Sequence, residues 1–194
     1  EHICSAIKRR ELFAFQRQTH DILEQQVKLR TLALEEEIAQ RKLAEEQYTH
    51  AASHDSLTGL ANRVLFNDLL NHAISSNKHF PKRIFAILFL DLDRFKVVND
   101  SLGHHAGDTL LKIVAKELIA LVRYKDTVAR FGGDEFVILI EDLDSEKEAY
   151  EIAERITEFL ARPFSIEEHS VYIGTSIGVL FNNERYDNAD TMLR

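Results

Sequence analysis

Two pairs of acidic residues stand beside apolar stretches of this 194-residue sequence and could bind a divalent metal ion. Asp91 and Asp93 follow the apolar run 84–90, and Asp134 and Glu135 follow a Gly-Gly pair. A carboxylate directly after a buried apolar run is costly unless it is hydrated, paired or bound to a metal. Because side chains alternate along a strand, Asp91 and Asp93 should share a face. Asp134 and Glu135 should diverge, and alternation does not decide which of the two would face a metal.

Each acidic pair taken alone also fits an ordinary structural role. Asp91 and Asp93 could cap the next segment or lie solvated at a strand end, and an acidic turn is common at a protein surface. The two pairs together favour a metal site, because Asp91, Asp134 and Glu135 would otherwise repel one another on neighbouring strands. Mg²⁺ or Mn²⁺ relieves such repulsion, and Mg²⁺ usually binds one or two carboxylates together with substrate phosphates.

Three polar residues between the two acidic pairs have the chemistry to bind a nucleotide. Lys96 is a point charge suited to a phosphate. Asn99 can donate and accept hydrogen bonds and Asp108 can accept two, which together match the edge of a guanine base. Taken alone, Asn99 is equally a turn residue and Asp108 equally the N-cap of a helix, so both alternatives stay open. Gly103 and Gly107 are expected to allow tight backbone turns.

The pattern around these positions predicts a compact α+β domain that begins near His54. Apolar residues at helical spacing indicate three helices, with Asn62 and the Ser145/Glu148 pair as candidate caps. The expected order is helix 62–76, a buried central strand 84–90, helix 107–123, strands 127–131 and 134–140 joined by a turn at 132–133, helix 145–161, strand 171–181 and the start of a helix at 187–194. This order predicts a ferredoxin-like mixed sheet flanked by helices.

Residues 1–50 contain no Gly or Pro and consist largely of good helix formers. One heptad register places Phe15, Ile22, Leu29, Leu32, Ala39 and Leu43 at a or d positions, with Gln18, Gln25, Glu36 and Glu46 in the remaining slots. A second, partial stripe of Val27, Leu34 and Ile38 competes with it. We expect a parallel dimeric coiled coil; the alternative is a single amphipathic helix packed on its own domain.

The overall composition excludes some classes of partner. The formal net charge of −8 argues against a nucleic-acid binder with a broad basic face, but it leaves room for a nucleotide held through divalent metals. The single cysteine, Cys4, can form no internal disulfide, and no apolar run is long enough to cross a bilayer. We therefore expect a cytoplasmic domain. The sequence opens at Glu1, so we interpret it as a piece of a longer protein that could include a membrane-attached region.

Five motifs give the sequence a family resemblance. They are the strings at 55–63 (DSLTGLANR), 89–100 (FLDLDRFKVVND), 103–108 (GHHAGD), 130–136 (RFGGDEF) and 175–178 (TSIG). Their order and spacing resemble the GGDEF family of diguanylate cyclases over about residues 51–194. The resemblance implies a nucleotidyl-cyclase-like version of the predicted α+β fold at 51–194, preceded by a signalling helix at 1–50.

The resemblance also implies an activity and assigns roles to the candidate residues. A member of this family condenses two GTP molecules into cyclic di-GMP and pyrophosphate, with two Mg²⁺ or Mn²⁺ ions per active site. The implied metal ligands are Asp91, the carbonyl of Leu92, Asp134 and Glu135, the last two being also catalytic. The implied substrate contacts are Lys96 with the phosphates, His104 near the nucleoside, and Asn99 and Asp108 with the guanine.

The resemblance extends to regulation and assembly. Arg123 and Asp126 match an RxxD motif that binds the product in many members and inhibits the enzyme. One domain cannot present two GTP molecules to each other, so we expect a homodimer, with an upstream sensor domain in the full-length protein. The family's last helix usually adds basic residues for the triphosphate, whereas this sequence stops at Arg194, so we expect a C-terminally truncated domain.

Two alternatives to an active cyclase stay open. The first is a catalytically weak domain that binds GTP or cyclic di-GMP as a regulatory receptor. The second is a domain in tandem with an EAL-type phosphodiesterase, which the stretch 162–166 suggests.

Overall fold

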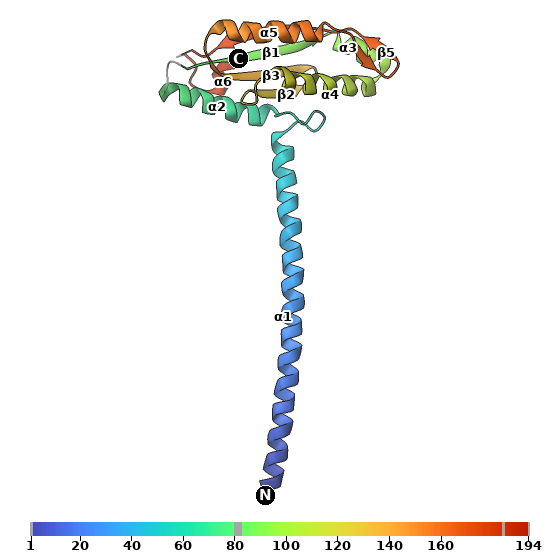
Figure 1. Ribbon diagram of the computed structural model, residues 1–194, viewed down its shortest axis with the longest axis vertical. Coiled ribbons are helices and arrows are strands. Elements are labelled where there is room, and N and C mark those ends of the chain that lie inside the picture. Colours follow the sequence, from blue (N-terminus) through green and yellow to red (C-terminus); the bar gives the residue numbers. More distant parts are fainter. Residues whose placement is uncertain (1, 80–82, 184, 194) are drawn as a thin grey trace. The chain divides into compact units, whose positions relative to one another are not determined.

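The computed structural model describes residues 2–79, 83–183 and 185–193, and the chain divides into two units, Glu1–Thr49 and His50–Arg194. Helix α1 (His2–Ser53) makes up the first unit and continues into the second (Figure 1). Several of its described apolar side chains, among them Leu29, Leu32 and Leu43, are exposed in the single chain. Pairing of this helix with a second copy stays a prediction. Within the described ranges, no helix combines the length and apolarity needed to cross a membrane.

The second unit is built around a four-stranded sheet (Figure 1). Its strands are β1 (Ile84–Asp93), β2 (Thr127–Gly132), β3 (Glu135–Leu143) and β6 (Gly174–Phe181), in the order β2-β3-β1-β6. The expected central strand is confirmed, since β1 lies between β3 and β6. The expected mixed sheet is wrong. Strands β1 and β2 are joined by a helical crossover and run parallel, but β3 lies between them, so every neighbouring pair is antiparallel.

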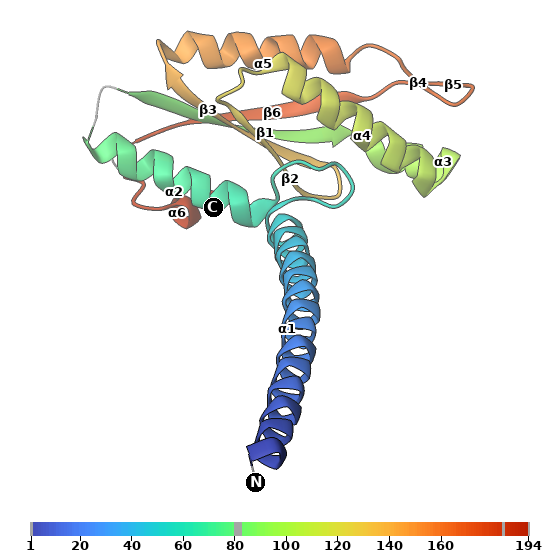
Figure 2. The same ribbon diagram turned by 60° about the horizontal axis from the view of Figure 1, so that its bottom comes forward.

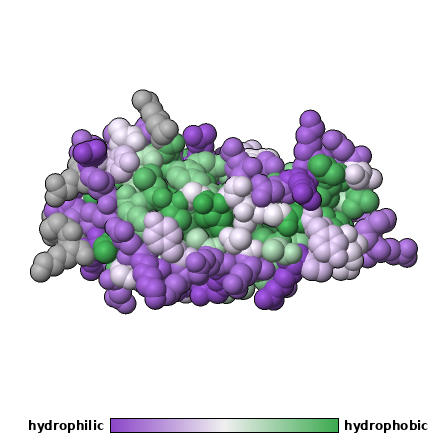
Figure 3. Space-filling model, turned by 90° about the horizontal axis from the view of Figure 1, so that it is seen from above, coloured by the Kyte–Doolittle hydropathy of each residue, from purple (hydrophilic) through white to green (hydrophobic). Residues whose placement is uncertain are grey.

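Helices cover both faces of this sheet, with α2 and α5 on opposite sides (Figures 1 and 2). The remaining elements are α2 (Arg63–His79), α3 (Phe95–Leu102), α4 (His104–Leu121), α5 (Glu146–Leu160), α6 (Ala189–Met192) and a small hairpin of β4 (Phe164–Ile166) and β5 (His169–Val171). Alternation along β1 supplies two cores: Leu88 and Leu90 pack with α4 and α5, and Phe85 and Ile87 pack with α2 and α6. Viewed from above, apolar surface lies along the middle of the unit between hydrophilic margins (Figure 3).

The expected helix 107–123 corresponds to α4, which begins earlier, at His104. A separate helix that was not expected, α3, precedes it, and the two helices meet at Gly103. Gly103 has φ +87°, a left-handed backbone that ends α3 and allows α4 to begin at His104. This boundary decides two of the alternatives. Asn99 lies inside α3 and is not a turn residue, and Asp108 lies inside α4, whose N-cap is Gly103.

The glycine hairpin forms one residue later than expected. Strand β2 ends at Gly132, which pairs with Glu135, so the turn residues are Gly133 and Asp134. The register is irregular between Arg130 and Gly132, and Gly133 has φ +53°. Because Asp134 lies in a turn and not on a strand, side-chain alternation does not determine its direction.

The ends of the other elements agree with the sequence only in part. Asn62 caps α2, since its Oδ1 accepts hydrogen bonds from the main-chain N–H groups of Val64 and Leu65 at 2.9 and 3.1 Å. The expected Ser145/Glu148 capping box is wrong, because the Ser145 side chain makes no cap hydrogen bond. The expected strand 171–181 is interrupted between β5 and β6, and the expected last helix is the short α6.

Candidate active site

The acidic pairs meet at one end of the sheet. In the register of the sheet, Asp91 lies opposite Glu135 of β3 on one side and Ser176 of β6 on the other. Side chains directly opposite in an antiparallel pair have Cβ atoms about 5 Å apart, so the carboxylates of Asp91 and Glu135 are neighbours. Asp93 is exposed on the same face of β1, where its Oδ1 accepts a hydrogen bond from Ser176 Oγ at 3.1 Å.

The electrostatics at this end favour a cation. Partial desolvation raises the pKa of the Asp91 carboxyl, and the negative charges of Asp134 and Asp93 raise it further. Asp134 therefore lies close enough to Asp91 to repel it, although the two residues are on different elements. A bound divalent ion would remove this repulsion.

A cavity of about 800 Å³ opens beside these carboxylates. Its lining combines Asp91 and Glu135 with Phe131, Ser176 and, from the start of α2, Arg63. The Arg63 guanidinium lies 5.2 Å from the centre of the Phe131 ring. The volume is within the range of about 300–1,000 Å³ that small-molecule sites occupy. The sequence had not singled out Arg63 as a site residue, because its proximity to β1 depends on how α2 packs.

The donor set fits a metal that arrives with its own ligands. Among the described residues, no three His, Cys, Asp or Glu side chains converge as a preformed metal site. Carboxylates and a main-chain oxygen are nevertheless the kind of donors that Mg²⁺ takes when water and substrate phosphates complete its coordination. Leu92, whose carbonyl was implied as a ligand, has a buried side chain and lies just beyond the last residue of β1 that pairs with β3.

The candidate guanine residues are brought together by the meeting of α3 and α4. A Cβ atom on Gly107 would lie 1.9 Å from Asn99 Oδ1, so any larger residue would displace that amide from its present position. Gly107 is thus required for space and not for the tight turn that we expected. Asn99 lies against Gly107 and so against the turn of α4 that also carries Asp108. The side chain of Asp108 is exposed.

The two other candidate substrate residues are exposed near the starts of these helices. Lys96 is the second residue of α3, and His104 is the first residue of α4. Both side chains are accessible to a ligand.

A partly buried ion pair between Arg130 and Asp55, which the sequence did not predict, forms a clamp on the hairpin turn. The Arg130 guanidinium binds both carboxylate oxygens of Asp55 at 3.0 and 3.1 Å, and it donates two hydrogen bonds to the Gly133 carbonyl at 3.1 and 2.8 Å. Burial would raise the pKa of Asp55, but hydrogen bonds from Thr58 and the charge and hydrogen bonds of Arg130 outweigh it and lower that pKa. The clamp therefore holds the peptide that directly precedes Asp134. Both residues belong to motifs noted above, but only the fold brings them together.

The RxxD residues lie in the turn between α4 and β2, at the opposite end of β2 from the glycine turn. Asp126 accepts main-chain hydrogen bonds on both oxygens, from Arg123 N at 2.9 Å and from Glu141 N at 3.3 Å. The Arg123 guanidinium forms an ion pair with Glu148 of α5. Tyr124, which follows Arg123 in the sequence, has a fully exposed side chain.

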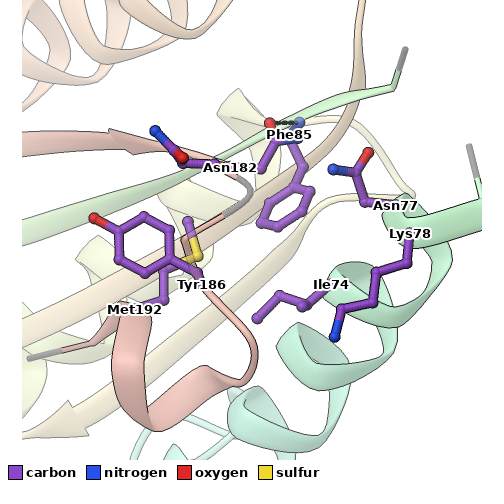
Figure 4. Close-up of a pocket in the computed structure, with 8 residues that line it drawn as sticks. Ile74, Asn77, Lys78, Phe85, Asn182, Tyr186 and Met192 are labelled. Carbon is purple, nitrogen blue, oxygen red and sulfur yellow. Dashed lines mark hydrogen bonds between the residues drawn. The ribbon is translucent and has the colours of Figure 1, made fainter. Parts of the chain in front are cut away.

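A second cavity, of about 450 Å³, lies at the other end of β1, between α2 and the segment after β6 (Figure 4). Phe85, Tyr186 and Met192 supply its apolar lining, and Lys78 lies at its edge, where it also pairs with Asp187 at 3.3 Å. None of the described residues that line this cavity is a carboxylate, so the acidic end of the sheet is the better candidate for a metal site.

Comparison with known proteins agrees with this architecture. Residues 52–194 match the model of the family described as diguanylate cyclase, GGDEF domain. Over 158 residues the chain is 43% identical to the bifunctional diguanylate cyclase/cyclic di-GMP phosphodiesterase MucR of Pseudomonas aeruginosa, a match that covers 81% of this chain and 22% of MucR. Over 134 residues it is 41% identical to the cyclic di-GMP phosphodiesterase NbdA of the same organism, covering 69% of this chain and 17% of NbdA.

A solved structure gives the same result. The GGDEF domain of TpbB from Pseudomonas aeruginosa superposes with a TM-score of 0.68 at 38% identity, covering 72% of this chain and 81% of that one. The matched region covers only about a fifth of the length of MucR and of NbdA. On the motif order, the fold and the family match over residues 52–194, the chain belongs to the GGDEF-domain family of diguanylate cyclases.

Proposed function

We propose that the chain synthesises cyclic di-GMP from two molecules of GTP with release of pyrophosphate. The observation that carries this proposal is the acidic end of the sheet, where Asp91 lies opposite Glu135, close to Asp134, at the edge of an 800 Å³ cavity. A nucleoside triphosphate with divalent ions matches both the charge and the size of this site. MucR, whose name includes diguanylate cyclase, supports the same reaction.

In the proposed reaction, the 3′-hydroxyl of each GTP attacks the α-phosphorus of the other, so that two phosphodiester bonds form and two molecules of pyrophosphate leave. Asp91, the Leu92 carbonyl, Asp134 and Glu135 are the groups that would hold two Mg²⁺ or Mn²⁺ ions. When bound, such ions neutralise the phosphates and lower the pKa of the attacking hydroxyl. Asp134 and Glu135 would be the catalytic carboxylates, and the hydrogen bonds from Arg130 to the Gly133 carbonyl would keep their turn in one conformation.

The remaining site residues would position the substrate. Asn99 would donate and accept hydrogen bonds at the guanine edge and Asp108 would accept them, with the amide of Asn99 held against Gly107. His104 would lie near the nucleoside, and Lys96 would contact the phosphates from the start of α3. Positioning and charge neutralisation supply most of the catalysis in phosphoryl transfer.

The active species would be a two-fold homodimer, because each domain would bind one GTP and the two GTP molecules would have to face each other. The exposed leucines of α1 support pairing of two copies through a coiled coil. An upstream sensor domain in the full-length protein would act through this helix.

Arg123 and Asp126 would form a separate site for the product. A guanidinium suits a phosphate, and a carboxylate suits the N–H groups of guanine. Product bound there would inhibit through a second site and a second arrangement of the domains.

The alternative is a catalytically weak domain that binds GTP or cyclic di-GMP in a longer protein with an EAL phosphodiesterase. The name of NbdA, a phosphodiesterase that is 41% identical over the matched region, favours keeping this alternative. The intact Gly132–Phe136 signature and the acidic cluster favour the cyclase.

Incubating the chain with GTP and Mg²⁺, followed by chromatography for cyclic di-GMP, separates the two functions. We expect two molecules of pyrophosphate for each molecule of cyclic di-GMP. GTP binding without turnover, in this chain and in a longer one, would favour the receptor.

A further inference from the structure

The turn after α4 carries an ion pair that the proposed reaction does not need. The Arg123 guanidinium pairs with the carboxylate of Glu148 on the first turn of α5. The side chain of Arg123 is 45% exposed and that of Glu148 only 18%, so the carboxylate is the more enclosed partner. Solvent and salt therefore screen this pair less than a fully exposed one.

Groups other than Arg123 also hold Glu148 in this position. Its Oε2 accepts the main-chain N–H of Asp144 at 3.2 Å, while Oε1 faces Arg123. The positive end of the α5 helix dipole also favours a carboxylate on the first turn. Glu148 is thus held beside Arg123 by a main-chain hydrogen bond as well as by the ion pair.

The other half of the RxxD motif is already engaged. Both carboxylate oxygens of Asp126 accept main-chain N–H groups, which tie the turn to itself and to β3. Arg123 is therefore the residue of this motif that would bind a phosphate. A phosphodiester that approaches Arg123 meets the negative charge of Glu148 at the same guanidinium.

We propose that Glu148 competes with the phosphodiester of cyclic di-GMP for Arg123 and so weakens the affinity of this turn for the product. The inference rests on the product site assigned to Arg123 and Asp126 under the proposed function. It adds a residue that lies outside the family motifs and that tunes how much product must accumulate before the site fills.

The test is a calorimetric titration of the full chain with cyclic di-GMP, using wild type, Glu148→Gln, Arg123→Ala and the double variant. Glu148→Gln keeps the size and the hydrogen-bonding shape of the side chain but removes its charge. We expect it to tighten the dissociation constant about fivefold, the scale of a partly screened ion pair. Arg123→Ala should weaken binding, and the double variant should bind like Arg123→Ala. Glu146→Gln, on the same turn of α5 and exposed, is the matched control and should bind like wild type.

The outcomes separate the inference from the function on which it rests. If Arg123→Ala weakens binding but Glu148→Gln does not tighten it, the competition is wrong and the product site stands. If Glu148→Gln tightens binding equally without Arg123, or if Glu146→Gln has the same effect, the charge does not act through Arg123 and the inference fails. If Arg123→Ala binds like wild type, the product site itself is wrong.

Discussion

The acidic end of β1 and the turn after α4 hold their charges in opposite ways. Within the described ranges, no Lys, Arg or His forms an ion pair with Asp91, Asp134 or Glu135. At the turn, by contrast, Arg123 is neutralised by Glu148 and Asp126 is held by main-chain N–H groups.

This difference separates a site that needs a ligand from one that is complete without it. Repelling carboxylates cost stability and gain from a bound cation, whereas paired charges contribute to the fold and must be taken from their partners before a ligand can use them. The acidic end should therefore respond to mutation in activity, and the turn should respond mainly in stability and product affinity.

The largest expected effect is at the acidic end. Asp91→Asn should lower the rate of cyclic di-GMP formation about a hundredfold to a thousandfold, because it removes a charged metal ligand. The rate is measured by chromatography at saturating GTP and Mg²⁺. Asp100→Asn, an exposed carboxylate on α3, is the control and should retain activity. A folded Asp91→Asn protein with a normal rate would contradict the metal assignment.

The second expected effect concerns the base. Asn99→Ala should lower GTP affinity roughly tenfold to a hundredfold and relax the preference for GTP over ATP, because guanine groups would be left unpaired. Gly107→Ala should have the same effect by displacing the Asn99 amide. Equilibrium binding of both nucleotides measures this.

The double variant tests the link between these two residues. In the Asn99→Ala background the added methyl group of Gly107→Ala meets no amide and should change affinity little. Additive losses would show that Gly107 acts in some other way.

A smaller effect is expected from the clamp behind the glycine turn. Asp55→Asn weakens the hold on Arg130 and should lower the rate about tenfold, because a misplaced turn misorients Asp134 and Glu135. The KM for GTP should change less than kcat, since Asp55 touches no substrate. If instead only thermal stability falls and kcat is unchanged, the clamp is structural and does not position the catalytic turn.

The smallest effect is in stability, where the two regions should differ in sign. Asp126→Ala should lower the free energy of unfolding by about 1–2 kcal/mol, because two main-chain N–H groups lose their acceptor. Metal-free Asp91→Asn should be slightly more stable than wild type at neutral pH. Urea denaturation in the presence of a chelator measures both.

The pH dependence of stability tests whether the charge of Asp91 destabilises the folded protein. Its pKa is raised in the folded protein above the ordinary value of 3.8, so ionisation favours the unfolded chain. Wild type should lose stability relative to Asp91→Asn as the pH rises from about 4 through the raised pKa, and the difference should then stay constant. A difference that is independent of pH would contradict the repulsion at the acidic end.

The sequence alone determined the family, the α+β class, the central strand and the acidic pair at its end. These features are local. Seven consecutive apolar residues form a strand buried on both faces, and a carboxylate that directly follows them must lie near the end of that strand. Cap chemistry located the start of α2 at Asn62 for the same reason, since a cap depends on residues next to it in the chain.

Only the tertiary structure decided which residues meet. Asp55 and Arg130 are far apart in the chain, and Glu148 became the partner of Arg123 only when α5 packed beside the α4 turn. The break at Gly103 and the one-residue shift of the glycine turn depend on a positive φ, which glycine permits but does not dictate. Pairing across an antiparallel sheet brought Asp91 to Glu135, because register is set by the packing of both faces and not by either strand alone.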